Sequence, residues 1–170
     1  MNRSRQHRAL ILLGSNIDRE RNIPLALAKL AAHPALALVA ASSVYESPAV
    51  GGSGPQPVFS NSAALLETGQ DATELRRILR EIEAEMGRVR SIDKYAPRPI
   101  DLDIILYNDF VGTVAGSPLP DPDLLRFPHI AVPCAEIAPG WVHPQTKETL
   151  AAISQKMENT AWLLKQPSNT

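Results

Sequence analysis

The chain has 170 residues, a formal net charge of −1 and a sequence pI of about 6.4. This length suits one core, so we expect a single domain over residues 1–170, with flexible tails at 1–7 and 166–170. The near-neutral charge argues against nucleic acid or a membrane surface as partner. One cysteine excludes an internal disulfide, and the apolar runs are too short for a membrane helix or a signal peptide, so we expect a cytoplasmic protein.

The first third of the chain predicts a strand, a helix and a second strand. Residues 8–14 contain four successive large apolar residues, which is typical of a buried strand, and Gly14-Ser15-Asn16 then favours a turn. Three apolar residues with helical spacing follow, and they predict a helix with Pro24 in its first turn. Alternation over residues 36–45 predicts the next strand.

A loop, a strand and a helix follow in the middle of the chain. Residues 47–57 include three glycines and three prolines, so this segment is either a lid over a site or a passive connection. Alternation over residues 58–66 predicts a strand on which Phe59 and Asn61 share a face. Asn61 either reads the edge of a heterocycle or makes a structural hydrogen bond. Asp71 is the predicted cap of a helix that ends at Gly87.

The last third combines an apolar strand with several prolines. The run from Ile100 to Ile105 predicts a strand, and Asn108-Asp109 favours a turn into residues 110–114, which would form a hairpin with it. Prolines at 118, 120 and 122 indicate an extended crossover, and Thr146 is the predicted cap of a last helix. Because helices and strands do not alternate regularly, we expect an α+β fold with an antiparallel or mixed sheet.

Two carboxylates on the predicted strand are the strongest functional signal. Side chains on a strand alternate between faces, so Asp101 and Asp103 point to the same side while their apolar neighbours point into the core. Carboxylates held this close repel each other unless a cation neutralises them, and an all-oxygen pair suits Mg²⁺. The sequence therefore predicts a metal site on this strand.

A basic segment precedes the two aspartates. It contains Arg88, Arg90, Lys94 and Arg98. Mg²⁺ usually bridges carboxylates to substrate phosphates, and guanidinium groups bind the same phosphate oxygens, so the combination predicts phosphoryl chemistry. The competing interpretation is a solvated strand face beside an exposed basic loop.

Taken together, Gly87-Arg88-Val89-Arg90 and the run from Lys94 to Ile105 resemble the signature of the 6-hydroxymethyl-7,8-dihydropterin pyrophosphokinase family. Further segments resemble the family in the same order, and the resemblance spans roughly residues 8 to 155: Gly14-Ser15-Asn16, Val44 to Pro48, Phe59-Ser60-Asn61, Leu119 to Pro122 and Pro133 to Pro139. It implies a ferredoxin-like fold in αβα layers with a mainly antiparallel sheet. It also implies an enzyme that transfers pyrophosphate from ATP to the pterin hydroxymethyl group, releases AMP and uses two Mg²⁺ ions. We expect the protein to be a monomer.

The resemblance also implies roles for individual residues. Asp101 and Asp103 would hold both metal ions, while Arg88 and Arg98 would stabilise charge on the transferred group. The nucleotide contacts would be Glu83, Arg90, Lys94, Tyr95, Ile104 and Asp121. The pterin contacts would be Ser47, Pro48, Val50, Phe59, Asn61 and His129.

Three positions depart from the family pattern. Asp121 stands where a histidine normally contacts ATP, Phe127 where an arginine is usual, and His129 where a phenylalanine closes the pterin sandwich. These changes leave open a diverged paralogue that keeps the ATP and metal site but acts on, or binds, another pterin-like compound. A ferredoxin-like RNA-binding module is a further alternative, but aromatic residues are only 5% of the chain and the sheet face carries acids.

Overall fold

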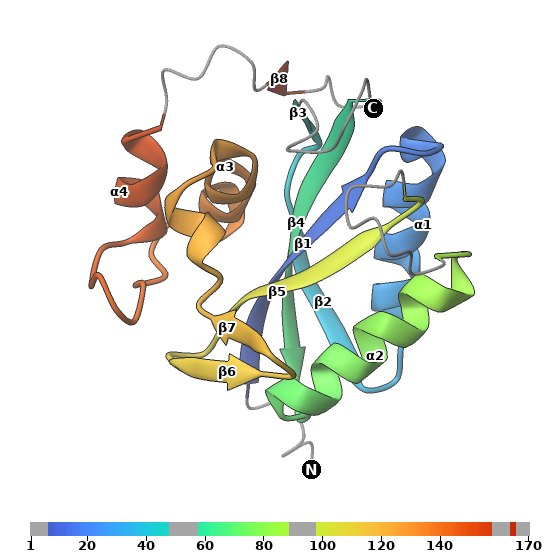
Figure 1. Ribbon diagram of the computed structural model, residues 1–170, viewed down its shortest axis with the longest axis horizontal. Coiled ribbons are helices and arrows are strands. Elements are labelled where there is room, and N and C mark those ends of the chain that lie inside the picture. Colours follow the sequence, from blue (N-terminus) through green and yellow to red (C-terminus); the bar gives the residue numbers. More distant parts are fainter. Residues whose placement is uncertain (1–6, 48–57, 89–97, 158–163, 166–170) are drawn as a thin grey trace.

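The computed structural model describes residues 7–47, 58–88, 98–157 and 164–165 (Figure 1). Its elements, in chain order, are β1 (His7–Ser15), α1 (Arg19–Ala32), β2 (Leu36–Ala41), β3 (Tyr45–Ser47), β4 (Phe59–Thr68), α2 (Ala72–Glu85), β5 (Asp101–Tyr107), β6 (Gly112–Val114), β7 (Ser117–Leu119), the 3₁₀ helix η1 (Pro122–Leu125), α3 (Pro128–Ile137), α4 (Leu150–Gln155) and β8 (Leu164–Lys165).

The main sheet has the order β5-β1-β4-β3-β8, and β2 also pairs with β4. Every described pair of strands is antiparallel. Apart from the short strand β3, the elements from β1 to β5 follow the βαββαβ order of ferredoxin-like folds: β1-α1-β2-β4-α2-β5. Helices α1 and α2 cover one face of the sheet, while α3 and α4 cover the other (Figure 1). The expected α+β class, layers and antiparallel sheet are confirmed.

The central strand β1 contributes to an apolar core on each face of the sheet. Ile11 and Leu13 belong to the cluster under α1 and α2, and Leu10 and Leu12 belong to the cluster under α3 and α4. This division explains the unbroken apolar run in β1, because a strand buried on both faces needs no polar alternation.

Helix α2 begins as predicted, and α1 does not. The Asp71 Oδ1 atom accepts a hydrogen bond from the Glu74 amide at 2.8 Å, which caps α2, and Gly87 follows the helix with a φ of +90°. Helix α1 starts at Arg19, so Pro24 lies inside the helix rather than in its first turn, and that expectation was wrong.

The predicted strand over residues 36–45 is divided into β2 and β3. At the break, the Ser42 amide donates to the Ala63 carbonyl at 2.8 Å, and the Ser42 Oγ atom accepts from the Ala63 amide at 2.8 Å. The Ser43 amide donates to Glu136 of α3 at 2.6 Å. Side chains thus replace ladder partners at this point, which sequence alternation does not reveal.

The C-terminal third corrects further predictions. Strand β6 pairs with β7 rather than with β5, through a turn in which Ala115 and Gly116 have φ values of 49° and 83°. The cap of α4 is Thr149, whose Oγ1 atom accepts from the Ala152 amide at 3.2 Å, and not Thr146. Helix α3 was not predicted, because prolines at positions 128 and 133 obscure it.

Two further findings concern the expected tail and the membrane. Strand β1 begins at His7, inside the stretch expected to be a tail, and the rest of both expected tails lies outside the described residues. Among the helices of the described ranges, none combines the length and apolar character needed to cross a bilayer.

Candidate active site

The two aspartates lie on β5, an edge strand of the main sheet. Asp101 pairs with Gly14 of β1, and Asp103 pairs with Leu12, which faces the α3 side. Both carboxylates therefore face the α3 side, as strand alternation predicts, and both are half-buried. Burial raises the pKa of Asp103, and the charges of Asp101, Glu83 and Asp121 raise it further. Negative charge is therefore crowded at this point.

Two arginines contact the first aspartate. The Arg88 Nη1 atom donates to Asp101 Oδ1 at 2.8 Å and to the Ile100 carbonyl at 3.0 Å. The Arg98 Nη1 atom donates to Asp101 Oδ2 at 3.2 Å. Both guanidinium groups are thus held beside the carboxylate pair, where they would meet phosphate oxygens.

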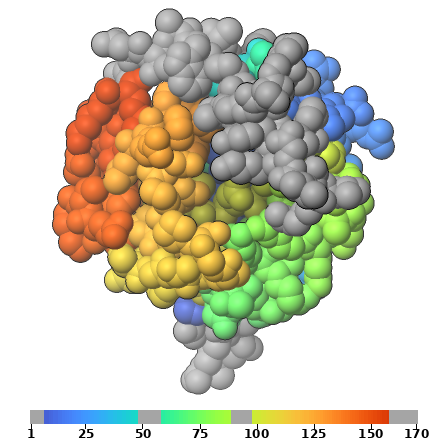
Figure 2. Space-filling view, in the orientation of Figure 1, coloured from blue at the N-terminus to red at the C-terminus, as the bar shows by residue number. Residues whose placement is uncertain are grey.

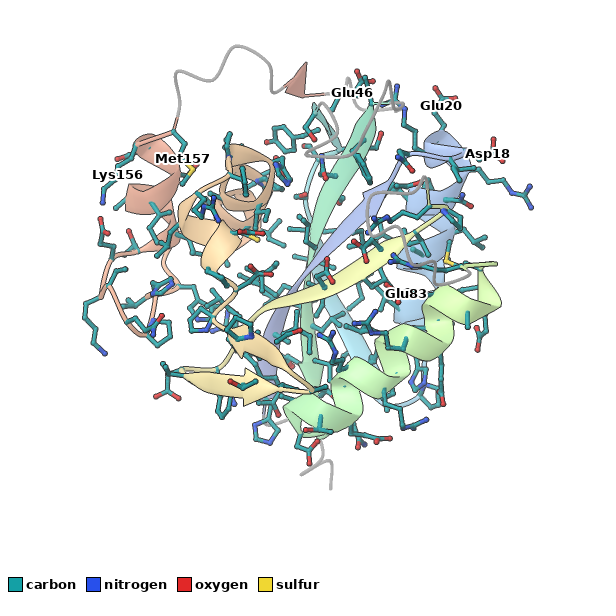
Figure 3. The ribbon with its side chains drawn as sticks, in the orientation of Figure 1. Asp18, Glu20, Glu46, Glu83, Lys156 and Met157 are labelled. Atoms are coloured by element: carbon teal, nitrogen blue, oxygen red, sulfur yellow. The ribbon has the colours of Figure 1, made fainter. Side chains whose placement is uncertain are left out.

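Glu83 connects α2 to the start of β5. Its side chain is 2% exposed, and Oε2 accepts a hydrogen bond from the Leu102 amide at 2.8 Å. Arg88 Nη1 lies 3.8 Å from Oε2, and Arg80 Nη1 lies 3.5 Å from Oε1. Burial is the main reason that the pKa of Glu83 rises to about 7. Figure 3 shows Glu83 on the side of α2 that faces β5.

Two of the predicted pterin residues, Phe59 and Asn61, lie on β4, across β1 from the aspartates. Gly14 pairs with Asn61 on one side and with Asp101 on the other. A Cβ atom on Gly14 would lie 3.7 Å from Phe59 Cδ1, 3.8 Å from Asn61 Oδ1 and 4.0 Å from Asp101 Cβ. Because Gly14 has no side chain, the space between Asp101 on one side and Phe59 and Asn61 on the other stays open.

Asn61 makes structural hydrogen bonds. Its Nδ2 atom donates to Ser47 Oγ at 2.7 Å and to the Tyr45 carbonyl at 3.5 Å. Asn61 and Ser47 are both buried, while Phe59 is half-buried. Asn61 thus makes the structural hydrogen bonds that were one of its two predicted roles. The Oδ1 atom of Asn61 lies next to Gly14. A role in reading a substrate edge stays a prediction.

Of the three atypical positions, Asp121 and Phe127 lie between β7 and α3, and His129 lies in the first turn of α3. The Asp121 amide donates to the Ile105 carbonyl of β5 at 2.9 Å, and Asp121 Oδ1 accepts from the Asp123 amide at 2.9 Å. Burial is the main reason that the pKa of Asp121 is raised. The His129 ring centroid lies 5.4 Å from that of Phe127, and burial lowers the pKa of His129 to about 4. His129 is therefore a neutral imidazole at pH 7.

The other predicted residues divide into one buried residue and five positions outside the described residues. The Ile104 side chain is 4% exposed and packs in the cluster under α2, so only its backbone can meet a nucleotide. The Leu102 amide points away from β1, toward Glu83. Backbone groups two residues apart on a strand point the same way, so the backbone of Ile104 also faces the outer edge of β5. The positions that lie outside the described residues are Pro48, Val50, Arg90, Lys94 and Tyr95.

Sequence reasoning missed Asn16 as a positioning residue. Its Oδ1 atom accepts from the Arg98 amide at 2.7 Å, and its own amide donates to the Arg98 carbonyl at 3.3 Å. Its Nδ2 atom is buried and has no hydrogen-bond partner within the described ranges. Asn16 also lines a cavity of about 390 Å³ together with Asp18, Arg19, Glu20 and Arg21. Its position directly after β1 was the available signal.

Sequence reasoning also missed Arg76 and Arg80, which lie half-buried on the α2 face beside Glu83. Figure 2 shows atoms of β5 recessed between α2 and the segment from β6 to α3. Helix α2, which carries both arginines, thus borders the recess over β5. Their helical spacing, at positions i and i+4, was visible in the sequence, but the direction in which that face points was not.

The donor set fits a hard divalent cation. Within the described ranges, no group of three or more His, Cys, Asp and Glu side chains is arranged to hold a metal ion. Asp101 and Asp103 could supply two ligands of a coordination shell, which would suit Mg²⁺ because this ion usually keeps water and phosphate ligands. The raised pKa of Asp103 supports the fit, since a cation would relieve the repulsion.

Comparisons with known proteins agree with this geometry. Residues 10–139 match the family model described as 7,8-dihydro-6-hydroxymethylpterin-pyrophosphokinase (HPPK). A 2-amino-4-hydroxy-6-hydroxymethyldihydropteridine pyrophosphokinase of Synechocystis sp. is 36% identical over 156 residues, which is 91% of this chain and 78% of the relative. The enzyme of the same name from Bacillus subtilis is 37% identical over 130 residues, which is 76% of this chain and 77% of the relative.

The solved structures that resemble the chain show the same fold. Wild-type HPPK-DHPS of Plasmodium falciparum matches with a TM-score of 0.69 and 13% identity over 92% of this chain, and with pteroate the TM-score is 0.66 and the identity 14%. The chain covers less than half of those proteins, 46% and 43%. Because the family model covers most of the chain and the two relatives exceed one-third identity, the chain belongs to the 7,8-dihydro-6-hydroxymethylpterin-pyrophosphokinase family.

Proposed function

We propose that the chain transfers the pyrophosphoryl group of ATP to the hydroxymethyl group of 6-hydroxymethyl-7,8-dihydropterin and releases AMP, as a step of folate biosynthesis. The observation that carries this function is the pair Asp101 and Asp103, with Arg88 and Arg98 held against it. A carboxylate pair for Mg²⁺ beside two guanidinium groups is the equipment that phosphoryl transfer needs.

The metal would bind at the aspartates. Asp101 and Asp103 would hold two Mg²⁺ ions, which when bound neutralise charge on the transferred phosphates and align the attacking and leaving oxygens. Arg88 and Arg98 contact Asp101 through hydrogen bonds of 2.8 and 3.2 Å, and they would stabilise negative charge on the transferred group. Glu83 fixes the Leu102 amide between the two aspartates and so positions both of them.

The pterin would lie over β4, across Gly14 from the metal pair. Phe59 would stack on the ring, and Ser47 and Asn61 would meet its edge. In this position the hydroxymethyl group faces Asp101 across a strand that has no side chain at residue 14. Substrate contacts at Pro48 and Val50, and nucleotide contacts at Arg90, Lys94 and Tyr95, stay predictions.

The test is a product assay with the purified protein, ATP, Mg²⁺ and the hydroxymethyl-dihydropterin. AMP and the pterin diphosphate should form in equal amounts, whereas formation of ADP, or no turnover, would contradict the proposal. Asp101→Asn and Asp103→Asn should each abolish Mg²⁺-dependent turnover and leave the far-UV circular dichroism unchanged. Near-normal activity of either variant would refute the metal assignment.

A second candidate function is supported by Asp121, Phe127 and His129. The neutral, half-buried His129 imidazole offers a smaller stacking surface than a phenylalanine, and Asp121 adds negative charge near Asp103. A diverged paralogue would bind another pterin-like compound with the same ATP site. A thermal-shift panel distinguishes the two, because a ligand that binds only the native state raises its Tm. The largest shift should come from the hydroxymethyl-dihydropterin, and a larger shift with another pterin would favour the paralogue.

Three further expectations complete the proposal. They are a single domain over residues 1–170, a monomer, and a cytoplasmic location that suits the single buried Cys134. Size-exclusion chromatography with light scattering tests the monomer, for which a mass near 18.5 kDa is expected.

A further inference from the structure

Arg76 is a half-buried arginine of α2 that the proposed mechanism does not use. In the part of the chain that the structure describes, its guanidinium group has neither a hydrogen bond nor an ion pair. Its neighbours on the same helix differ: Arg77 pairs with Glu74 and Glu81 on the exposed side, and Arg80 lies 3.5 Å from Glu83. An arginine that is partly removed from water without a partner is costly unless an anion completes the site.

The packing of α2 against β5 places Arg76 opposite the middle of that strand. The two elements run in opposite directions, because Glu83 near the end of α2 accepts from Leu102, while Tyr107 at the end of β5 donates to the Gln70 carbonyl just before α2. Arg76 lies between these two anchors on the helix, and Asp103 lies between them on the strand. Burial and the neighbouring Arg80 lower the pKa of Arg76, whereas the negative charges of Asp103, Glu83 and Asp101 raise it, so all three carboxylates act on its guanidinium group.

The direction of the reaction identifies the anion. The pterin lies over β4 in the proposed function, and the sheet order is β4, β1, β5. In an in-line displacement the attacking and leaving oxygens lie on opposite sides of the transferred phosphorus. The leaving AMP therefore points away from β4, toward the outer edge of β5 and α2, where Arg76 has no hydrogen-bond or ion-pair partner among the described residues.

We propose that Arg76 binds the α-phosphate of the nucleotide, the group that ATP and the product AMP share. This inference rests on the proposed function and adds a nucleotide-binding residue to it. Arg76 would bind the phosphate through its guanidinium fork, separately from Arg88 and Arg98, which lie at the Asp101 end of the site.

The experiment compares Arg76→Gln and Arg76→Lys with Arg77→Gln, the matched control on the exposed side of the same turn. Isothermal titration calorimetry measures the Kd of α,β-methylene-ATP with Mg²⁺ and the Kd of AMP. For Arg76→Gln, both Kd values should rise about tenfold, which is about 1.4 kcal/mol, because a charge-assisted hydrogen bond is lost. Arg76→Lys should lie between wild type and Arg76→Gln, since it keeps the charge but not the fork. Arg77→Gln should stay within about twofold of wild type, as expected for an exposed pair.

Steady-state kinetics provide the second readout. The KM for ATP should rise in Arg76→Gln while the KM for the pterin stays unchanged. Unchanged Kd values in both Arg76 variants would overturn the proposal, and a loss confined to α,β-methylene-ATP would overturn the assignment to the α-phosphate. If Arg76→Gln does not fold, unchanged Kd values in Arg76→Lys alone overturn the proposal. Failure of the proposed function would be distinct, because wild type itself would then form no AMP from ATP and the pterin.

Discussion

Replacing Glu83 by glutamine should stabilise the protein at neutral and alkaline pH, and the gain should disappear in acid. Glutamine keeps an oxygen that can accept the hydrogen bond from the Leu102 amide and removes the buried charge. The pKa of Glu83 is raised from 4.5 to about 7, chiefly because the side chain is buried. At 1.36 kcal/mol per pKa unit, the ionised carboxylate therefore costs the folded state about 3 kcal/mol relative to the unfolded chain.

The pH window follows from these two pKa values. Below pH 4.5 the carboxyl group is protonated in both states, and the charge costs nothing. As the pH rises from 4.5 through about 7, the unfolded chain loses the proton first, so the free energy of unfolding of wild type falls relative to that of Glu83→Gln. Above this window the difference between the two proteins stays constant, about 3 kcal/mol larger than at pH 4.5.

The assay is urea unfolding of both proteins at several pH values from 4.5 to 8.5. Taking the difference between the variant and wild type removes the contributions of other titrating groups. Glu85→Gln is the matched control, because Glu85 lies in the same helical turn, 59% exposed, in a 3.1 Å pair with Lys29. Its effect should stay within about 1 kcal/mol throughout the range. If the free-energy difference for Glu83→Gln were flat with pH, the raised pKa and its cause would both be refuted.

Three further changes test other parts of the structure. Asp103→Asn should raise the free energy of unfolding without Mg²⁺ by about 1–3 kcal/mol, the usual size of a single-site effect, because it relieves crowded negative charge; a loss of stability in urea unfolding would contradict this. Gly14→Val should raise the KM for the pterin at least about tenfold by overpacking the space near Phe59, and leave the Kd for α,β-methylene-ATP unchanged; an unchanged KM would remove Gly14 from the pterin site. Cys134 should not react with Ellman's reagent in the native protein at pH 8, since burial raises its pKa to about 12, and should react fully in urea; rapid native reaction would disprove its burial.

Local patterns predicted most of the ferredoxin-like part of the fold. The apolar run of β1, the capped stripe of α2 and the alternation of β5 each produce a signal within one element. Predictions failed where tertiary contacts decide the local structure. The break between β2 and β3 depends on Glu136, which is distant in sequence, and the partner of β6 was decided by a turn at Ala115 and Gly116 rather than at Asn108.

The candidate site was predictable to the extent that it depends on strand alternation. Asp101 and Asp103 share a face because side chains on a strand alternate, whatever the rest of the fold does. The sequence does not reveal which way a helix turns its polar side. Arg76 and Arg77 are identical neighbours in the sequence, yet Arg76 is half-buried and senses the charges of the carboxylates, whereas Arg77 is exposed and pairs with two glutamates.

The central position of β1 has a consequence for the synthesis of the protein. Strand β1 is made first, but its second neighbour in the sheet, β5, is made almost a hundred residues later. Until Tyr107 has left the ribosome, one edge of β1, with its apolar run over residues 9–13, has no partner, and such an edge invites association between chains. Truncations that end before β5 should therefore aggregate rather than yield a partly active domain, because pairing of β5 with β1 completes the sheet and the proposed metal-binding face together.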